Sequence, residues 1–211
     1  MRHFKNIIIG FGKAGKTLAG TLAKHGEEVL VIEKDPKMYG GTCINVACLP
    51  TKNMIISAHS GVNYEEALKR KNQLTSMLRD KNYHKVADQK EATVLTATAE
   101  FLDDHTLQVS DNSGQEQLTA ERIFINTGAK PILPNINGLL DSKRVFTSTD
   151  LLDKNSQTKE LVILGSGPIG LEFASMYAQF GSHVAVIDQA PMILGRFEPE
   201  IAEQAKKDLE E

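Results

Sequence analysis

The 211-residue chain has only two cysteines, Cys43 and Cys48, and both lie in one short segment, GGTCINVACLPTK, at residues 40–52. Four residues separate the two thiols. Such a pair could be a structural disulfide, part of a metal site, or a dithiol that cycles between oxidised and reduced forms. The residue types and the spacing around the pair help to choose among these chemistries.

Neither a metal site nor a permanent disulfide accounts well for the pair. Structural zinc sites usually take four Cys or His ligands, and the spacing of His59 and His84 does not complete such a set. A disulfide here would close a short loop and restrain little chain entropy. Pro50 marks a helix start just after Cys48, and helix starts lower the pKa of a thiol. We therefore favour a redox dithiol and predict no metal site, while both alternatives stay open.

One segment of the chain occurs twice, at an offset of 155 residues. Residues 6–36 read NIIIGFGKAGKTLAGTLAKHGEEVLVIEKDP, and residues 161–191 read LVILGSGPIGLEFASMYAQFGSHVAVIDQAP. In each copy, G-x-G-x-x-G links an apolar run to a helical pattern, and a second apolar run then ends in an acid. The glycines and acids are Gly10, Gly12, Gly15 and Glu33 in the first copy, and Gly165, Gly167, Gly170 and Asp188 in the second.

The three glycines and the acid suit the binding of a dinucleotide. The first glycine permits a tight turn, the second lets the backbone approach a pyrophosphate, and the third lets the helix pack on the strand. Free N–H groups at the helix start face the phosphates, and the acid accepts hydrogen bonds from a ribose. One such motif is weak evidence. Two motifs in the same strand–turn–helix context favour two dinucleotide sites over two glycine-rich turns without a ligand.

The segment between the two copies changes from helical to strand-like. Residues 49–87 have a helical pattern with alternating charges, and residues 92–126 alternate as strands with a hairpin signal at DNSG. We therefore predict an α/β fold of two Rossmann-like modules, the first with an antiparallel β-meander insert and the second truncated. The predicted domains are residues 1–150 and residues 151–211.

Composition excludes several classes of function. The net charge is −3 and the pI is near 6.1, so the overall charge gives no reason to expect binding to nucleic acid or to an anionic membrane surface. No apolar run approaches the ~18–20 residues of a membrane helix, and the N-terminal apolar run is too short for a signal peptide. We expect a cytoplasmic protein that acts on a small molecule.

The chain contains a first G-x-G-x-x-G motif, then GGTCINVACLPTK, and then a second G-x-G-x-x-G motif. This order of motifs resembles the class I pyridine nucleotide–disulfide oxidoreductases, such as glutathione reductase, dihydrolipoamide dehydrogenase and mercuric reductase. GFGKAGKTLA and MYGGTCIN are most similar to the bacterial branch that detoxifies reactive chlorine species and hypothiocyanous acid. The resemblance implies a flavoprotein enzyme that passes hydride from NAD(P)H through FAD to a Cys43–Cys48 disulfide. The electrons then reach an oxidised substrate: a disulfide, a reactive-chlorine oxidant or a metal ion.

The resemblance also implies roles for individual residues. Cys48 would be the thiolate against the flavin that forms the charge-transfer complex, and Cys43 the thiol that meets the substrate. Lys52, paired with Glu172, would face the flavin, although both could be ordinary surface charges. The other implied FAD-binding residues are Gly10, Gly12, Gly15, Glu33, Gly41, Thr42, Thr127 and Gly128. For the nicotinamide the residues are Gly165, Gly167, Gly170 and Asp188, and the acid at 188 favours NADH, with NADPH as the alternative.

The chain also departs from the family pattern. Ala47 stands where the family usually has glycine. The second FAD segment, the C-terminal dimerisation domain and the His–Glu acid–base pair have no counterpart, so the chain resembles the N-terminal part of an enzyme more than twice as long. That full-length enzyme would be a homodimer. The alternative functions are dihydrolipoamide dehydrogenase, mercuric reductase, or a catalytically inactive FAD-binding module.

Overall fold

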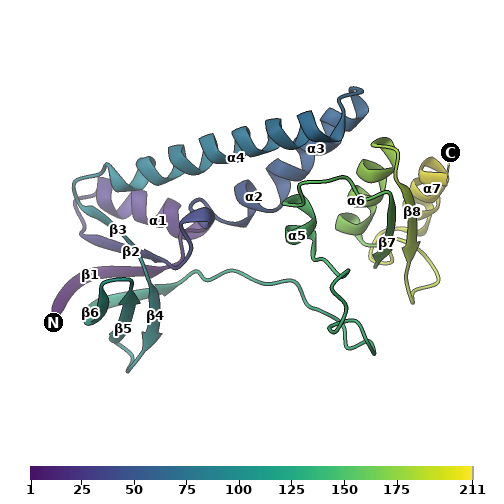
Figure 1. The fold of residues 1–211 in the computed structure, drawn as a ribbon. Coiled ribbons are helices and arrows are strands. Elements are labelled where there is room, and N and C mark those ends of the chain that lie inside the picture. The colour runs from purple at the N-terminus through teal and green to yellow at the C-terminus, as the bar shows by residue number, and fades with distance from the viewer. Residues whose placement is uncertain (211) are drawn as a thin grey trace. The chain divides into compact units, whose positions relative to one another are not determined.

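The computed structural model describes residues 1–210 and divides into two compact units (Figure 1). The first unit comprises Met1–Leu49 and Leu74–Val145, and the second comprises Pro50–Gln73 and the chain from Phe146 onward. The helices are α1 (Lys13–Lys24), the 3-10 helix η1 (Pro36–Met38), α2 (Thr42–Asn45), α3 (Cys48–His59), α4 (Tyr64–Ala87), α5 (Ser148–Leu152), α6 (Pro168–Gln179) and α7 (Pro199–Glu210). The predicted assignment of residues 1–150 to FAD binding and of 151–211 to NAD(P)H binding concerns ligands and stays a prediction.

One mixed sheet organises the first unit, with the strand order β3-β2-β1-β6-β5-β4. The strands are β1 (Arg2–Ile9), β2 (Val29–Glu33), β3 (Ala92–Thr96), β4 (Thr98–Phe101), β5 (Thr106–Asp111) and β6 (Gly114–Ile125). β1 pairs in parallel with β2 and β6, β2 pairs in parallel with β3, and β4 to β6 form an antiparallel meander. The predicted α/β fold with an antiparallel segment is therefore confirmed, but β3 joins the parallel part of the sheet instead of the meander.

The hairpin predicted at DNSG joins β5 to β6. Asp111 pairs with Gly114 across the turn. The Oδ1 atom of Asp111 accepts hydrogen bonds from the N–H of Ser113 at 2.7 Å and of Gly114 at 3.1 Å. Gly114 has a φ of 142°, which side chains other than glycine rarely adopt. The residue types of the turn thus fix the register of the meander.

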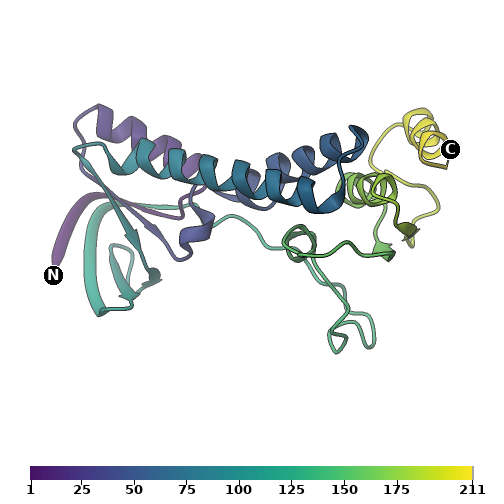
Figure 2. The same ribbon diagram turned by 45° about the horizontal axis from the view of Figure 1, so that its top comes forward.

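Both faces of the parallel strands are covered. Ile7 of β1 belongs to a buried cluster with Leu107 and Leu118 of the meander. The next residue, Ile8, belongs to another cluster that includes Val86 of α4. Figure 2 shows α1 and α4 along the same face of the sheet. The continuous apolar runs at β1 and β2 therefore have the burial that parallel strands require.

The second unit repeats the strand–helix–strand plan of β1, α1 and β2. Its strands β7 (Glu160–Leu164) and β8 (His183–Ile187) pair in parallel, and α6 connects them. A buried cluster joins α6 to α3 and to the first part of α4, and includes Met54, Tyr64, Phe173, Met176 and Tyr177. Among the described residues, no helix is both long and apolar enough to cross a membrane.

Candidate redox and dinucleotide-binding sites

The two G-x-G-x-x-G turns have the same backbone geometry. Gly10 has a φ of 106° and Gly165 a φ of 107°. The N–H of Gly10 donates to the carbonyl of Ile32 at 2.7 Å, and the N–H of Gly165 donates to the carbonyl of Ile187 at 2.8 Å. Positive φ in this range is open to glycine and strained for other residues. The first glycine of each motif is therefore required by the turn itself.

Both turns open a helix whose first N–H groups lack a side-chain cap. Gly12 is the N-cap of α1 and Gly167 is the N-cap of α6, and neither helix has an acid in its first turn. A Cβ on Gly15 would overlap the carbonyl oxygen of Gly10, and a Cβ on Gly170 would overlap that of Gly165. The helices thus pack closely on their turns and leave N–H donors that suit a phosphate.

The acid that ends the second strand of each copy is held by its turn. Glu33 Oε2 accepts a hydrogen bond from the N–H of Phe11 at 2.9 Å. Asp188 Oδ2 accepts one from the N–H of Ser166 at 2.6 Å. Hydrogen bonds from the N–H of Ala190, and then from Ser166, lower the pKa of Asp188 to about 2. Asp188 is therefore ionised at neutral pH.

The redox segment and the first turn lie in contact. Gly41 has a φ of 85°, and a Cβ built on it would come within 2.7 Å of the Gly12 Cα. The N–H of Gly40 donates to the carbonyl of Phe11 at 3.0 Å. The segment that carries the cysteines is thus placed against the turn that the sequence assigns to a pyrophosphate.

The two cysteines occupy the starts of two successive helices. Cys43 is the second residue of α2, and Cys48 is the first residue of α3. Both are free thiols and both are exposed. The helix start predicted near Pro50 is confirmed, because Pro50 is the third residue of α3. The arrangement leaves both sulfur atoms accessible for exchange with another thiol or disulfide.

The thiol of Cys43 is adjacent to the thiol of Cys48. A side-chain hydrogen bond with Cys48 is the largest cause that raises the pKa of Cys43, and partial burial adds to it. The positive charges of Lys16 and Lys13 act in the opposite direction. At Cys43 the neighbouring thiol and partial burial therefore outweigh the effect of the two cations.

Polar side chains from α1, α2 and α4 hold the redox segment in place through hydrogen bonds. Asn45 donates to the carbonyl of Gly41 at 2.9 Å and accepts from Arg79 Nε at 2.9 Å. Lys16 Nζ donates to the carbonyl of Gly40 at 3.2 Å and to the side chain of Asn82. Sequence reasoning missed these residues because no motif marks them. The only available signal was the presence of an amide and a lysine inside the CINVAC and GKAGK segments.

Lys52 and Glu172 form an ion pair between α3 and α6, both within the second unit. Their side chains are 54% and 36% exposed, so the pair contributes little to stability. The structure thus brings these two residues together. Their implied role beside a flavin stays a prediction.

The remaining predicted FAD-binding residues lie at the edges of the first turn and of the redox segment. Thr42 is the first residue of α2. Thr127 and Gly128 directly follow β6 and Asn126, whose Nδ2 donates to the carbonyl of Gly10 at 3.2 Å. Asn126, for which no role was predicted, therefore links the end of β6 to the first turn. Within residues 1–210, no three or more His, Cys, Asp or Glu side chains gather as a metal site.

Comparison with known proteins assigns the family. The family model for pyridine nucleotide-disulphide oxidoreductases matches residues 4–211. The chain belongs to this family. It is 45% identical to the probable pyridine nucleotide-disulfide oxidoreductase RclA of Escherichia coli over 203 residues, which are 96% of this chain and 46% of RclA. It is 32% identical to a mercuric reductase of Bacillus cereus, covering 97% of this chain and 34% of the relative.

Solved structures of family members share the fold. The structure of the HOCl-induced flavoprotein disulfide reductase RclA from Escherichia coli superposes with a TM-score of 0.93 at 43% identity, covering 98% of this chain and 47% of that one. The Cu(II) complex of RclA gives a TM-score of 0.96 at 44% identity, covering 100% of this chain and 48% of that one. This member of the family thus spans about half the length of the relatives it matches. Membership implies FAD and a pyridine nucleotide as cofactors.

Proposed function

We propose that this chain carries the electron-transfer centre of an NAD(P)H-dependent flavoprotein disulfide reductase. In this assignment the first strand–helix–strand copy binds FAD, the second binds the nicotinamide nucleotide, and Cys43 and Cys48 form the redox disulfide. The observation that carries the proposal is the contact of Gly41 with Gly12, which holds the dithiol segment against the first dinucleotide turn.

The residues of the first unit fit FAD. The uncapped start of α1 offers N–H donors to a pyrophosphate, and Glu33 lies at the end of β2, where its carboxylate would accept hydrogen bonds from the hydroxyl groups of a ribose. When bound, FAD would accept a hydride from the reduced nicotinamide and return two electrons to a disulfide. Gly10, Gly12, Gly15, Gly41, Thr42, Thr127 and Gly128 complete the proposed FAD-binding set of this unit, and the role beside the flavin that the resemblance implies for Lys52 stays a prediction.

The two thiols can reduce a disulfide substrate by exchange. The Cys43 thiolate attacks one substrate sulfur, a mixed disulfide forms, and the other substrate sulfur leaves as a thiolate that takes a proton. The Cys48 thiolate then attacks the Cys43 sulfur and releases the second substrate thiol. One substrate disulfide becomes two thiols, and two protein thiols become one disulfide. The exposure of both cysteines allows both attacks.

Asp188 supports NADH as the preferred nucleotide. The carboxylate is ionised at neutral pH and lies at the end of β8, the position that meets the adenosine ribose in this type of fold. A negative charge there repels the 2′-phosphate of NADPH. In this proposal Gly165, Gly167 and Gly170 provide the turn and NADPH is the weaker donor.

For the oxidised substrate we propose a disulfide, a reactive-chlorine oxidant or a metal ion. RclA, a relative of this chain, is described as HOCl-induced and has been solved as a Cu(II) complex, and another relative is a mercuric reductase. A dihydrolipoyl dehydrogenase of Mycoplasma pneumoniae is 30% identical to this chain, covering 97% of this chain and 48% of the dehydrogenase. Hg(II) is therefore the alternative oxidised substrate. Dihydrolipoamide, a dithiol, is the alternative substrate for an enzyme that works in the opposite direction and passes electrons to the nucleotide. The dimer and the cytoplasmic location expected for the whole enzyme stay predictions.

The test counts thiols after reduction by the nucleotide. The purified chain is oxidised mildly, loaded with FAD, mixed anaerobically with NADH and treated with iodoacetamide, and the added mass is measured. We expect two alkylated cysteines with FAD and none without it. A Cys48→Ala chain is the matched control, because it should bind FAD without forming the internal disulfide.

Two results would contradict parts of the proposal. Failure of Cys43 and Cys48 to form a disulfide under mild oxidation would remove the redox assignment. Bound FAD that leaves the disulfide oxidised after NADH is added would favour the alternative of a catalytically inactive FAD-binding module. Repeating the experiment with NADPH tests the preference assigned to Asp188.

A further inference from the structure

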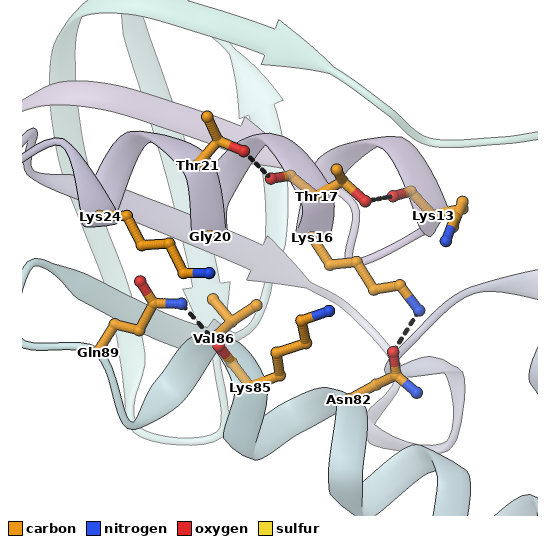
Figure 3. A pocket seen from close by; sticks show the side chains of 10 residues that line it. All are labelled: Lys13, Lys16, Thr17, Gly20, Thr21, Lys24, Asn82, Lys85, Val86 and Gln89. Atoms are coloured by element: carbon orange, nitrogen blue, oxygen red, sulfur yellow. Dashed lines mark hydrogen bonds between the residues drawn. The ribbon is translucent and has the colours of Figure 1, made fainter.

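Four lysines surround a pocket between α1 and α4 in the first unit. The cavity has a volume of about 280 Å³, and its lysines are Lys13, Lys16, Lys24 and Lys85. Thr17, Gly20, Thr21, Asn82, Val86 and Gln89 complete the lining. Figure 3 shows the amines of Lys16, Lys24 and Lys85 directed into the space between the two helices. We call this cavity the lysine pocket.

The positive charge of the lysine pocket is not compensated by the protein. No Asp or Glu is among its lining residues, and none of its four lysines forms an ion pair within the described part of the chain. Burial, followed by the charges of Lys13 and Lys85, lowers the pKa of Lys16. The lysines therefore repel one another, although the chain as a whole has a net charge of −3.

The size and chemistry of the lysine pocket define its ligand. Its volume of about 280 Å³ lies at the lower end of ligand pockets, which suits a compact ligand better than a dinucleotide. Lysine amines act as point charges and are common phosphate-binding groups, and the lining of the pocket contains no arginine. Four cations around one cavity match an anion with several charges.

We propose that the lysine pocket binds a small polyanion with two or three linked phosphates, and that binding is transmitted to the redox segment through Lys16. Lys16 lines the pocket and also donates to the carbonyl of Gly40, three residues before Cys43. Asn82, another lining residue, accepts from the same amine. The role of this connection in catalysis rests on the proposed function, whereas the binding site itself does not.

The bound anion would act on Cys43 by neutralising positive charge. Lys16 and Lys13 are the two cations whose charge favours the thiolate of Cys43. The opposing influences on that thiol are Cys48, through its hydrogen bond and its charge, and partial burial. A polyphosphate beside the lysines offsets their effect, so less Cys43 is ionised at a given pH. The ligand should therefore slow the attack of Cys43 on an electrophile.

Binding is tested with inorganic tripolyphosphate by titration calorimetry on the whole chain. We expect saturable binding that weakens with salt, and a loss of about tenfold or more in affinity for the Lys24→Met, Lys85→Met double variant. Lys81→Met and Lys69→Met together are the matched control: both lysines are exposed and neither lines the pocket. Absence of saturable binding, or an equal loss in the control, would overturn the site.

A second titration distinguishes two sources of linked phosphates. ATP carries the same triphosphate as the inorganic probe together with a nucleoside. Tighter binding of ATP that is lost in the Lys24→Met, Lys85→Met variant would assign a nucleotide to the pocket. Equal or weaker binding of ATP would assign inorganic polyphosphate. ATP binding that the variant does not weaken belongs to another site and would count against a nucleotide in the lysine pocket.

The coupling is tested on a Cys48→Ala chain, in which Cys43 is the sole thiol. We expect saturating tripolyphosphate to slow alkylation of Cys43 by iodoacetamide about threefold at pH 8. A further Lys16→Gln change keeps an N–H donor for Gly40 but removes the charge, and should abolish most of this response. Binding without any change in alkylation would overturn the coupling. Neither readout needs FAD, so failure of the proposed function would not affect them.

Discussion

Gly41 and Gly12 approach so closely that a Cβ on Gly41 would come within 2.7 Å of the Gly12 Cα and 3.1 Å of the Lys13 nitrogen. The contact joins two segments that the sequence separates by more than twenty residues: the redox segment and the first dinucleotide turn. Because the neighbouring atoms belong to the backbone, no side chain can rotate away. The two segments can therefore be tested as one structural feature.

Replacement of Gly41 by alanine should destabilise the first unit. The strained φ of 85° and the overlap with the Gly12 backbone act together, so we expect a loss of about 2 kcal/mol or more in the free energy of unfolding. Urea denaturation followed by circular dichroism measures it. Gly26→Ala is the matched control, because Gly26 has a φ of 76° but nothing within 4 Å of its Cβ position. Equal losses in the two variants would show that the contact is unimportant.

The reactivity of Cys43 should depend on its neighbours in opposite directions. The Cys48→Ala substitution removes the hydrogen bond that is the largest cause of the raised pKa, so the pKa of Cys43 should fall. The Lys16→Gln substitution, which removes a positive charge, should raise the pKa of Cys43. The alkylation rate of Cys43 as a function of pH gives the midpoint in each chain. A midpoint that Cys48→Ala leaves unchanged would contradict the hydrogen bond between the thiols.

Much of the fold could be predicted because its signals are local. The offset of 155 residues between the two fingerprints corresponds to β1–α1–β2 and β7–α6–β8, and the glycines at 10 and 165 adopt nearly the same φ. The DNSG turn could be predicted from its residue types alone. The parallel pairing of β3 could not, because strand alternation does not specify which neighbour a strand will choose.

The residues of the site could be predicted where a sequence motif marks them. They could not be predicted where contacts between distant segments of the chain bring them together. The cysteine pair and the turn glycines carry fixed spacings, so the sequence marks them. Asn45, Arg79 and Asn126 act through hydrogen bonds between residues that are distant in sequence, such as the 116 positions between Asn126 and Gly10. Nor could the raised pKa of Cys43 be predicted, because it depends on how closely the second thiol approaches.

Asn45 should be important for the stability of the redox segment. Its side chain is nearly buried, donates to the carbonyls of Tyr39 and Gly41 at 3.0 and 2.9 Å, and accepts from Arg79. Asn45→Ala leaves these groups without their partner, so we expect a loss of about 1–3 kcal/mol in the free energy of unfolding. Urea denaturation measures it. Arg79→Met removes only the bond to Arg79 and should cost less; the reverse order would contradict this account.

The carboxylate of Asp188 should stabilise the second unit in a pH-dependent way. Hydrogen bonds from the N–H of Ala190 and from Ser166 lower its pKa to about 2, below the ordinary value of 3.8. A lowered pKa means that the folded state favours the ionised form, so the stabilisation is complete above about pH 4 and is lost as the pH falls towards 2. Comparison of Asp188→Asn with the parent chain by thermal unfolding at several pH values measures this contribution.

We expect the parent chain to unfold at a higher temperature than Asp188→Asn at pH 5 to 7, and the difference to narrow between pH 4 and 2. An amide at 188 still accepts hydrogen bonds, so the variant should fold, and its own stability should lack this titration. Asp141→Asn is the matched control, since Asp141 is an exposed carboxylate outside both turns. If the difference in unfolding temperature between the parent chain and Asp188→Asn stayed constant down to pH 2, the N–H groups of Ser166 and Ala190 would not be stabilising the ionised carboxylate.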